Sequence, residues 1–391
     1  MLLEQNCGHL PYPCRFQDPA ATSQVVIPHR VFAPQCLKKS CEEVLLQLIP
    51  QCLSAAYDLL GTHPFSRLDV LIVPPNFSSL GMASPHIIFM SQSTLSGGSH
   101  LCGTRLCHEI AHAWFGLAIG ARDWTEEWLS EGFATHLEDA FWSAAQQLSA
   151  DEAKEQQDLK AVLRWQRLRD EVQNSEGDLQ VLRPKKENTG KASESGASVI
   201  KHGLNAEKVF MQVHYLKGYF LLRSFAGKAG EAAYFAFLKN FVRAFHGQLI
   251  LSQVLASLAS VKIIQELKNL SYEDKLSIYV LEAWRWGSLS PDQLVLLLEC
   301  LLEKKTLCSK MLECLQKTYH LREQDAEVRH RWCELVIKHK YTAGYVDVEK
   351  FLKEDQPSDS SVATEWGKGC GSKVWAKNAT RDPEANIWLV T

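Results

Sequence analysis

A chain of 391 residues with 46% hydrophobic and 22% charged residues has the composition of an ordinary globular protein, and it is long enough for two or three domains. Its net charge of −3 lacks the strong basic excess that marks most nucleic-acid-binding domains, so no nucleic-acid partner is expected. No run of about eighteen apolar residues occurs, so no membrane span is expected either.

The first third of the chain predicts a helix and two strands. Residues 1–34 are rich in proline and weakly patterned, so we expect an irregular lead-in. The apolar spacing over residues 38–60 predicts a helix with a kink or break at Pro50. Strands are expected over residues 68–74 and 86–90, which are short apolar runs bounded by turn residues. The second strand precedes the motif described next, and it could form an edge on which an extended peptide pairs.

Residues 108–112 have the form H-E-x-x-H. On a helix, His108 and His112 project from one face and can hold one divalent metal ion, for which zinc is well suited. Glu131 follows after eighteen intervening residues inside an apolar segment, and we expect it to supply the third ligand from a second helix. Glu109 would lie beside the open fourth position and act as the general base. A buried structural pair of histidines is the alternative interpretation of the short motif alone.

Helices continue beyond this motif. The helix with the two histidines is expected over residues 101–119, and the helix with the third ligand over residues 123–148. Residues 150–206 are polar and mixed in charge, which predicts a flexible insertion. Two more helices are expected over residues 209–222 and 231–245.

The last part of the chain has the pattern of a helical array. Its best-marked helices are expected over residues 276–286, 291–303, 310–319 and 328–338. Ser290 and Pro291 supply an N-cap and a first-turn proline for the second of these helices. Antiparallel helical pairs of this kind predict a solenoid-like domain over residues 251–355. Residues 356–391 are expected to be a disordered tail.

Three segments carry a family resemblance: residues 108–116 (HEIAHAWFG), 128–134 (WLSEGFA) and 215–218 (YLKG). They resemble the M1 zinc aminopeptidases, or gluzincins, and within them the branch that holds leukotriene A4 hydrolase, aminopeptidase B and aminopeptidase O. The H-E-x-x-H-x18-E pattern is highly specific for this family. The resemblance implies an α+β, mostly α fold, in which a thermolysin-like zinc peptidase domain over residues 35–250 precedes the helical domain.

The resemblance also implies a function and further site residues. It implies a metalloaminopeptidase with one zinc ion per chain that removes N-terminal residues from peptides. The family tyrosine falls on Tyr215, whose hydroxyl would stabilise the oxyanion of the tetrahedral intermediate; a core tyrosine is the alternative. An acidic specificity residue falls on Glu207, where a carboxylate would favour a basic N-terminal side chain; an exposed charge at the end of a loop is the alternative.

The chain departs from the family in two places. Where the family has G-x-M-E-N, this chain has Gly81, Met82 and Ala83 followed by serine. Ala83 replaces the glutamate that holds the substrate ammonium, so another carboxylate, Glu207 or Glu126, would have to replace it. The large N-terminal β domain of the family is almost absent, which predicts a shortened form. These departures motivate a second hypothesis, a catalytically weak or inactive zinc-binding protein that binds peptides or a protein partner.

Cysteine spacing and the start of the chain bear on the compartment. The twelve cysteines follow no paired spacing, which predicts free thiols in a reducing environment. Residues 1–6 lack the basic start and long apolar core of a secretory signal. We therefore expect a cytoplasmic protein that is not secreted. The basic cluster in residues 183–191 could be a nuclear address or a solvated loop.

Overall fold

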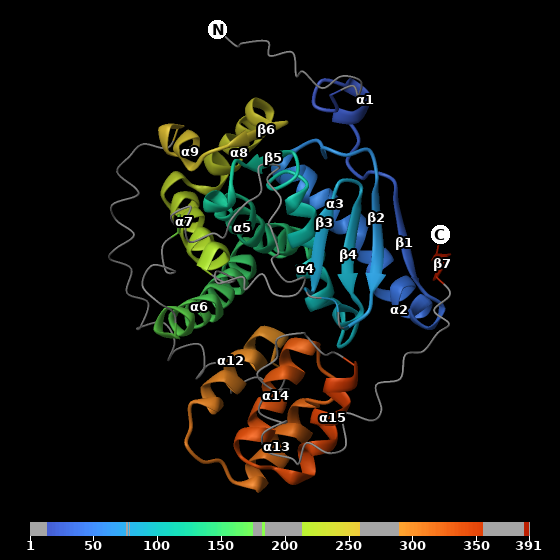
Figure 1. Ribbon diagram of the computed structural model, residues 1–391, viewed down its shortest axis with the longest axis vertical. Helices are drawn as coiled ribbons and strands as arrows, with labels where there is room; N and C mark the ends of the chain where they lie inside the picture. The colour runs from blue at the N-terminus through green and yellow to red at the C-terminus, as the bar shows by residue number, and fades with distance from the viewer. Residues whose placement is uncertain are drawn as a thin grey trace, which may run out of the picture.

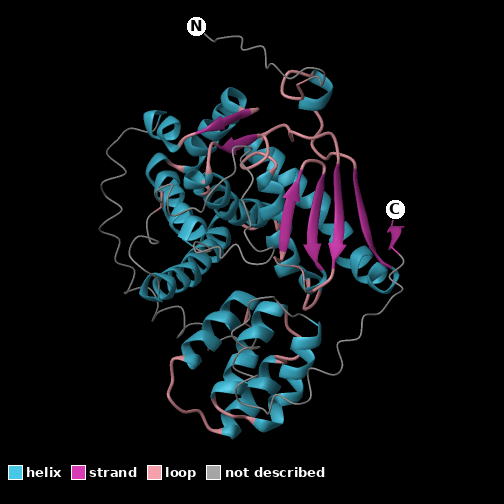
Figure 2. Cartoon of the chain, viewed as in Figure 1, coloured by secondary structure: helices cyan, strands magenta, loops and turns pink. Residues whose placement is uncertain are grey.

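The computed structural model describes residues 14–75, 77, 79–174, 182–183, 213–258, 289–354 and 387–390. In this part of the chain a small sheet stands beside one group of helices, and a second group of helices lies at one end of the molecule (Figure 1). Helices predominate over strands (Figure 2), so the predicted α+β, mostly α class is confirmed. None of the described helices is both long and apolar enough to cross a lipid bilayer.

The sheet has five strands in the order β3-β4-β2-β1-β7. Their bounds are β1 His29–Pro34, β2 Leu68–Val73, β3 Gly81–Ser84, β4 Ile87–Ser91 and β7 Ile387–Val390. β1, β2 and β4 are parallel, whereas β3 and β7 are antiparallel to the strands they pair with. The two predicted strands are confirmed as β2 and β4. However, β4 is paired on both sides, so the open edge belongs to β3 and the expectation of an edge at residues 86–90 is wrong.

β1 lies in the segment where the sequence predicts an irregular lead-in, so that prediction is wrong for His29–Pro34. Val31 and Ala33 are fully buried against the helices. Phe32 stands between them, and Arg30 beside them lies 2.8 Å from the carboxylate of Asp69 on β2. A strand of six residues with a charged member shows too little alternation to be recognised from its sequence.

Three helices pack against one another, and α4 also contacts β3 and β4 of the sheet: α3 (Leu46–Leu60), α4 (Ser99–His112) and α5 (Trp128–Ala145). Figure 1 shows α3 behind the sheet and α4 beside β3. Pro50 lies inside α3, and a π-helical turn precedes the helix. Their apolar faces join those of β1, β2 and β4 in one core, whose fully buried members include Val31, Val70, Met90, Ile49 and Leu106. This core holds the apolar side of α4.

α4 ends at His112, seven residues before the predicted end of the helix over residues 101–119. In the turn that follows, the N–H groups of residues 117–119 donate to carbonyls five residues earlier, and Gly116 has a φ of +126°. The chain then enters a short strand, β5 (Ile119–Ala121). The apolar run continues through the turn, so periodicity alone could not show where the helix ends.

The remaining helices are mostly where the sequence predicts them. Their bounds are α7 Val213–Ala229, α8 Glu231–Phe245, α12 Pro291–Leu302, α13 Ser309–Tyr319, α14 Ala326–Lys338 and α15 Tyr345–Glu354. Ser290 caps α12 in a capping box with Gln293. α12 to α15 form the second group of helices (Figure 1), with a core around Leu298 and Trp332 that Leu101 of α4 also joins.

α6 (Ala150–Asn174) occupies the first part of residues 150–206, so the prediction of a flexible insertion is wrong for this segment. Leu159, Val162 and Leu163 pack with apolar residues of α4, α12 and α14. Charged residues of α6 form ion pairs with α5, α12 and α14. A helix whose charges meet other side chains instead of water has little contrast between its faces, which explains why its composition resembles that of a loop.

Some predictions fall outside the described residues. They include the helix over residues 276–286, the rest of the range 150–206 apart from 182–183, and Glu207. In the tail over residues 356–391 only β7 is described, and for these four residues the prediction of disorder is wrong. The other short elements are α1 (Pro19–Thr22), α2 (Lys38–Ser40), α9 (Ser252–Leu258) and β6 (Gln248–Ile250), which pairs with β5.

Candidate metal centre

The H-E-x-x-H motif lies at the C-terminal end of α4, and Glu131 lies in the first turn of α5. The Oε2 atom of Glu131 is 3.6 Å from Nε2 of His108 and 3.3 Å from Nε2 of His112. One ligand atom from each of these three residues lies within 4.8 Å of the other two. The structure therefore brings two imidazoles and one carboxylate to a single point.

Hydrogen bonds behind His112 fix which of its nitrogens faces that point. Nδ1 of His112 donates to the main-chain carbonyl of Phe115 at 3.1 Å, and the hydroxyl of Ser130 lies 3.2 Å from the same nitrogen. With the proton held on Nδ1, the lone pair of the neutral ring is on Nε2, toward Glu131. The turn that ends α4 at His112 thus also orients its imidazole.

A carboxylate performs the same task behind His108. The Oε2 atom of Glu138 lies 3.3 Å from Nδ1 of His108, and its other oxygen lies 3.1 Å from Arg164 and 3.5 Å from Lys160. Glu138 is seven residues after Glu131, so the two carboxylates share one face of α5 two turns apart. A carboxylate on the far nitrogen of a histidine ligand fixes the ring and raises its basicity.

Burial makes the charges of this site depend on one another. Burial acts to lower the pKa of His108, but Glu131 and Glu138 outweigh it and raise the pKa to about 9. Burial acts to raise the pKa of Glu131, but His112 and His108 outweigh it, so the pKa lies below its ordinary range. An ionised carboxylate between two imidazoles attracts positive charge.

The donor set fits a zinc ion. Two imidazole nitrogens and a carboxylate oxygen are the ligands of catalytic zinc sites that keep a fourth position open. The buried Oε2 atom of Glu131 has no hydrogen-bond partner in the part of the chain that the structure describes, and a cation would satisfy it. His108, His112 and Glu131 could therefore hold one zinc ion.

Glu109 lies directly on the backbone of β3. A Cβ atom built on Gly81 would lie 2.3 Å from Oε1 of Glu109, so only glycine allows this approach. Burial raises the pKa of Glu109, and Glu131 adds to this effect against the two imidazoles. Met82, next along β3, is 47% exposed. The base candidate thus faces the open edge of the sheet, where an extended peptide could pair.

Ala83 lines a small pocket beside Glu109. The other polar residues of this pocket include His63, Arg67 and His86. Among the pocket-lining residues that the structure describes, Glu109 is the only carboxylate. Burial lowers the pKa of His63 to about 3, so this imidazole is neutral at physiological pH. At Ala83, where the resemblance implies a glutamate, the described residues of this pocket therefore supply no second carboxylate.

Tyr215 lies on α7 with its ring stacked on that of His108, at 6.1 Å between centroids and 18° between planes. A Cβ atom built on Gly132 would lie 2.8 Å from Cα of Gly218, so α5 and α7 touch through their backbones beside Tyr215. Burial raises the pKa of Tyr215, and Glu131 raises it further, so the hydroxyl stays protonated and can donate. The structure therefore places a donor at the metal centre.

Glu207 and Glu126 are the two carboxylates that the sequence offers in place of the glutamate implied at Ala83. Glu207 lies outside the described residues. Glu126 has no exposed side-chain surface and lies 3.0 Å from Nε of Arg183, so it is not open to a substrate. The sequence analysis did not predict Glu138 and Lys160, which lie behind His108. The spacing of seven residues from Glu131 could have indicated Glu138, but nothing local indicates Lys160.

The sequence of this chain matches two family profiles. The profile of the peptidase family M1 domain matches residues 46–273, and that of the leukotriene A4 hydrolase C-terminal domain matches residues 289–358. The chain is 59% identical to aminopeptidase O of Homo sapiens, over 90% of this chain and 48% of that protein. It is 26% identical to aminopeptidase B of Mus musculus, over 85% of this chain and 55% of that protein. The chain thus spans about half the length of the curated relatives it matches.

A solved structure has the same fold. Leukotriene A4 hydrolase from Saccharomyces cerevisiae aligns with a TM-score of 0.65 and 18% identity, over 87% of this chain and 62% of that chain. At this identity the likeness concerns the fold alone. The M1 profile, in contrast, covers more than half of the sequence and includes the three segments that carry the resemblance. The chain therefore belongs to the M1 family of peptidases.

Proposed function

We propose that this chain is a zinc-dependent aminopeptidase that hydrolyses the N-terminal residue from peptides. The observation that carries the proposal is the convergence of His108, His112 and Glu131, with Glu109 beside them on the edge of the sheet. Membership of the M1 family supports the same reaction class. A zinc ion held by the three ligands would supply Lewis acidity at the scissile carbonyl.

The residues of the chain divide the remaining work. Glu109 accepts a proton from the attacking water and passes it to the leaving amine. Tyr215 donates a hydrogen bond to the oxyanion of the tetrahedral intermediate. The peptide pairs along β3, where Gly81 and Met82 offer main-chain groups and Ala83 leaves room beside them.

Recognition of the peptide terminus forms part of the proposal. Ala83 cannot hold an ammonium group, so a carboxylate elsewhere must do so. We assign this role to Glu207, which would also favour a basic N-terminal side chain. A substrate panel that varies only the N-terminal residue tests this assignment: Glu207→Gln should lower the preference for arginine and lysine over leucine, and an unchanged preference would contradict it.

The free cysteines of the described residues fit a cytoplasmic location.

The substitution Glu109→Gln tests the reaction. It should lower turnover of fluorogenic aminoacyl substrates by at least about 100-fold, because a general base contributes at least that factor, while the zinc content stays that of the parent chain. A chelator should abolish the activity of the parent chain, and added zinc should restore it. Glu313→Gln, an exposed change on α13, is the matched control. A zinc-loaded parent chain without chelator-sensitive turnover would overturn the proposal.

A second candidate function is peptide or partner binding without turnover. The pocket at Ala83 favours it, because the pocket holds two histidines and an arginine where the family has an ammonium-binding glutamate. Under this alternative, Glu109→Gln leaves peptide affinity unchanged and the parent chain shows no turnover. Fluorescence anisotropy with a labelled, uncleaved peptide would measure that affinity for both chains.

A further inference from the structure

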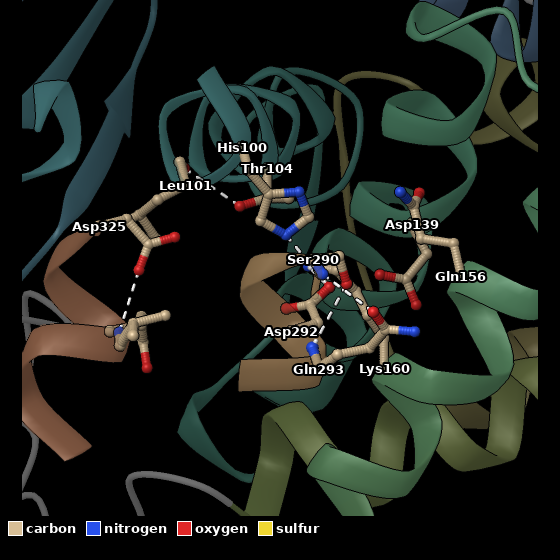
Figure 3. Close-up of polar contacts among 12 residues, drawn as sticks. His100, Leu101, Thr104, Asp139, Gln156, Lys160, Ser290, Asp292, Gln293 and Asp325 are labelled. Carbon is tan, nitrogen blue, oxygen red and sulfur yellow. Dashed lines mark hydrogen bonds and ion pairs between the residues drawn. The ribbon is translucent and has the colours of Figure 1, made fainter. Parts of the chain in front are cut away.

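A chain of mostly buried charged groups connects the second group of helices to α4. Asp292 lies in the first turn of α12, and its Oδ2 atom is 3.1 Å from Nε2 of His100 in the first turn of α4. Nζ of Lys160 on α6 lies 3.9 Å from the same oxygen. Figure 3 shows the side chains of His100 and Asp292 pointing toward each other, with Ser290 and Gln293 beside Asp292.

The same lysine also contacts Glu138, the carboxylate behind His108. Nζ of Lys160 is 3.5 Å from Oε1 of Glu138, and Oε2 of Glu138 is 3.3 Å from Nδ1 of His108. The side chains are 15% exposed at Asp292, 11% at Lys160 and 5% at Glu138, so little water screens them. Asp292, Lys160, Glu138 and His108 therefore form one continuous series from α12 to a candidate metal ligand.

The buried charges of this series are balanced by their neighbours in it. A buried carboxylate requires a cation, and Glu138 has two of them, Arg164 and Lys160. Arg164 is shared with Asp139, so it cannot serve Glu138 alone. Lys160 has a long, flexible side chain, and Asp292 gives its ammonium a second fixed contact.

The anchor itself is rigid. The capping box of Ser290 and Gln293 fixes the turn that carries Asp292, and Pro291 removes freedom from the same turn. The N-terminus of α12 also favours a negative charge at this position. The place of Asp292 is thus determined by α12, on the far side of the series from the metal centre.

We propose that Asp292 and Lys160 are positioning residues for His108, so that the contact of α12 with α4 and α6 sets the affinity of the metal centre for zinc. This inference rests on the metal centre of the proposed function, but it extends that centre into the second group of helices. Neither residue belongs to the candidate ligand set of His108, His112 and Glu131. Both act through Glu138, whose orientation determines how the ring of His108 is held.

Zinc affinity of Asp292→Asn and Lys160→Met, measured by competition with a chromophoric chelator, tests this role. Each substitution should weaken zinc binding by about tenfold, the lower end of what loss of a group behind a metal ligand causes. Lys160→Arg keeps the charge and should stay within about twofold of the parent chain. Glu299→Gln is the matched control, because it lies on the same helix α12 and pairs with Arg331 of α14 instead.

A second measurement separates positioning from a general loss of stability. In the cobalt-loaded protein, the visible absorption bands should shift in Asp292→Asn and Lys160→Met and should stay unchanged in Glu299→Gln. Folded Lys160→Met and Lys160→Arg chains with equal zinc affinity would overturn the inference, and this comparison also decides the matter if Asp292→Asn fails to fold. A parent chain that binds no zinc would instead overturn the proposed function.

Discussion

α4 and α6 both border the metal centre, but they are held in place by different combinations of contacts. α4 is packed on the main core through fully buried apolar residues such as Leu106 and Ile110. α6 is largely polar, and beside its buried leucines and valine it also buries Arg164 and Gln166. The difference shows that paired charges can add to apolar contacts in placing a helix in a folded core, even where its sequence has the composition of a loop.

The two kinds of contact respond differently to substitution. Truncation of an apolar side chain removes its contacts and leaves a cavity, so the loss scales with the volume removed. Removal of one member of a buried ion pair leaves the other charge without a partner, and the cost then includes the full desolvation of that group. We therefore expect single substitutions on α6 to be as damaging as those on α4.

The largest effect is expected for Arg164→Ala. Arg164 lies 3.1 Å from Glu138, also pairs with Asp139, and its guanidinium stands 4.3 Å from the ring centroid of Tyr219. Its loss leaves two buried carboxylates with too few cations, so the free energy of unfolding should fall by about 3–5 kcal/mol. Urea unfolding followed by circular dichroism measures the change.

Arg169→Ala on the same helix is the control for this experiment. Its pair with Glu303 has side chains that are 41% and 66% exposed, so the change should stay within about 0.5 kcal/mol. Similar losses for the two arginines would mean that α6 is not held by its buried charges.

Leu106→Ala should have a smaller effect of roughly 3 kcal/mol, because its side chain is fully buried in the main core. The measurement is the same urea titration, with Leu249→Ala as the control, since Leu249 is 69% exposed. A loss of less than about 1 kcal/mol for Leu106→Ala would show that the apolar side of α4 contributes little, and the contrast between the two helices would then disappear.

The same contrast explains what could be predicted from the sequence. The approach of His108, His112 and Glu131 follows from helical periodicity and from a loop of limited length, which are local properties. The partners of α6 lie far away in sequence: Lys160 meets Asp292, more than a hundred residues later. Composition and periodicity contain no information on such pairs, so α6 was predicted to be flexible.

Other differences between prediction and structure arise from non-local contacts, or from an apolar pattern that does not mark where a helix ends. β1 is stabilised by pairing with β2, and its own six residues show little alternation. The end of α4 at His112 depends on a turn whose residues are as apolar as the helix. The stacking of Tyr215 on His108 joins α7 to α4 across a hundred residues, and only the family resemblance indicated it.

The smallest effect is expected for Glu327→Gln, at a second ionic contact of α14 with α4 and α6. Glu327 lies 2.9 Å from Arg167 and 3.7 Å from Arg105. Burial acts to raise the pKa of Glu327, but Arg167 and Arg105 outweigh it and lower the pKa to about 2. The neutral amide keeps the shape but loses the charge, so unfolding at neutral pH should require about 2 kcal/mol less free energy.

The lowered pKa of Glu327 determines how the loss of stability in Glu327→Gln varies with pH. The pKa of Glu327 in the folded chain is below the ordinary value of 4.5, so its contribution is complete above about pH 4.5 and is lost as the pH falls toward 2. The free energy of unfolding of the parent chain should therefore fall more steeply over this interval than that of Glu327→Gln, and the two curves should converge. Glu303→Gln, at the exposed pair between the end of α12 and Arg169 of α6, should follow the parent curve. Parallel curves for the parent chain and Glu327→Gln would show that the arginines of α4 and α6 do not hold α14 through this carboxylate.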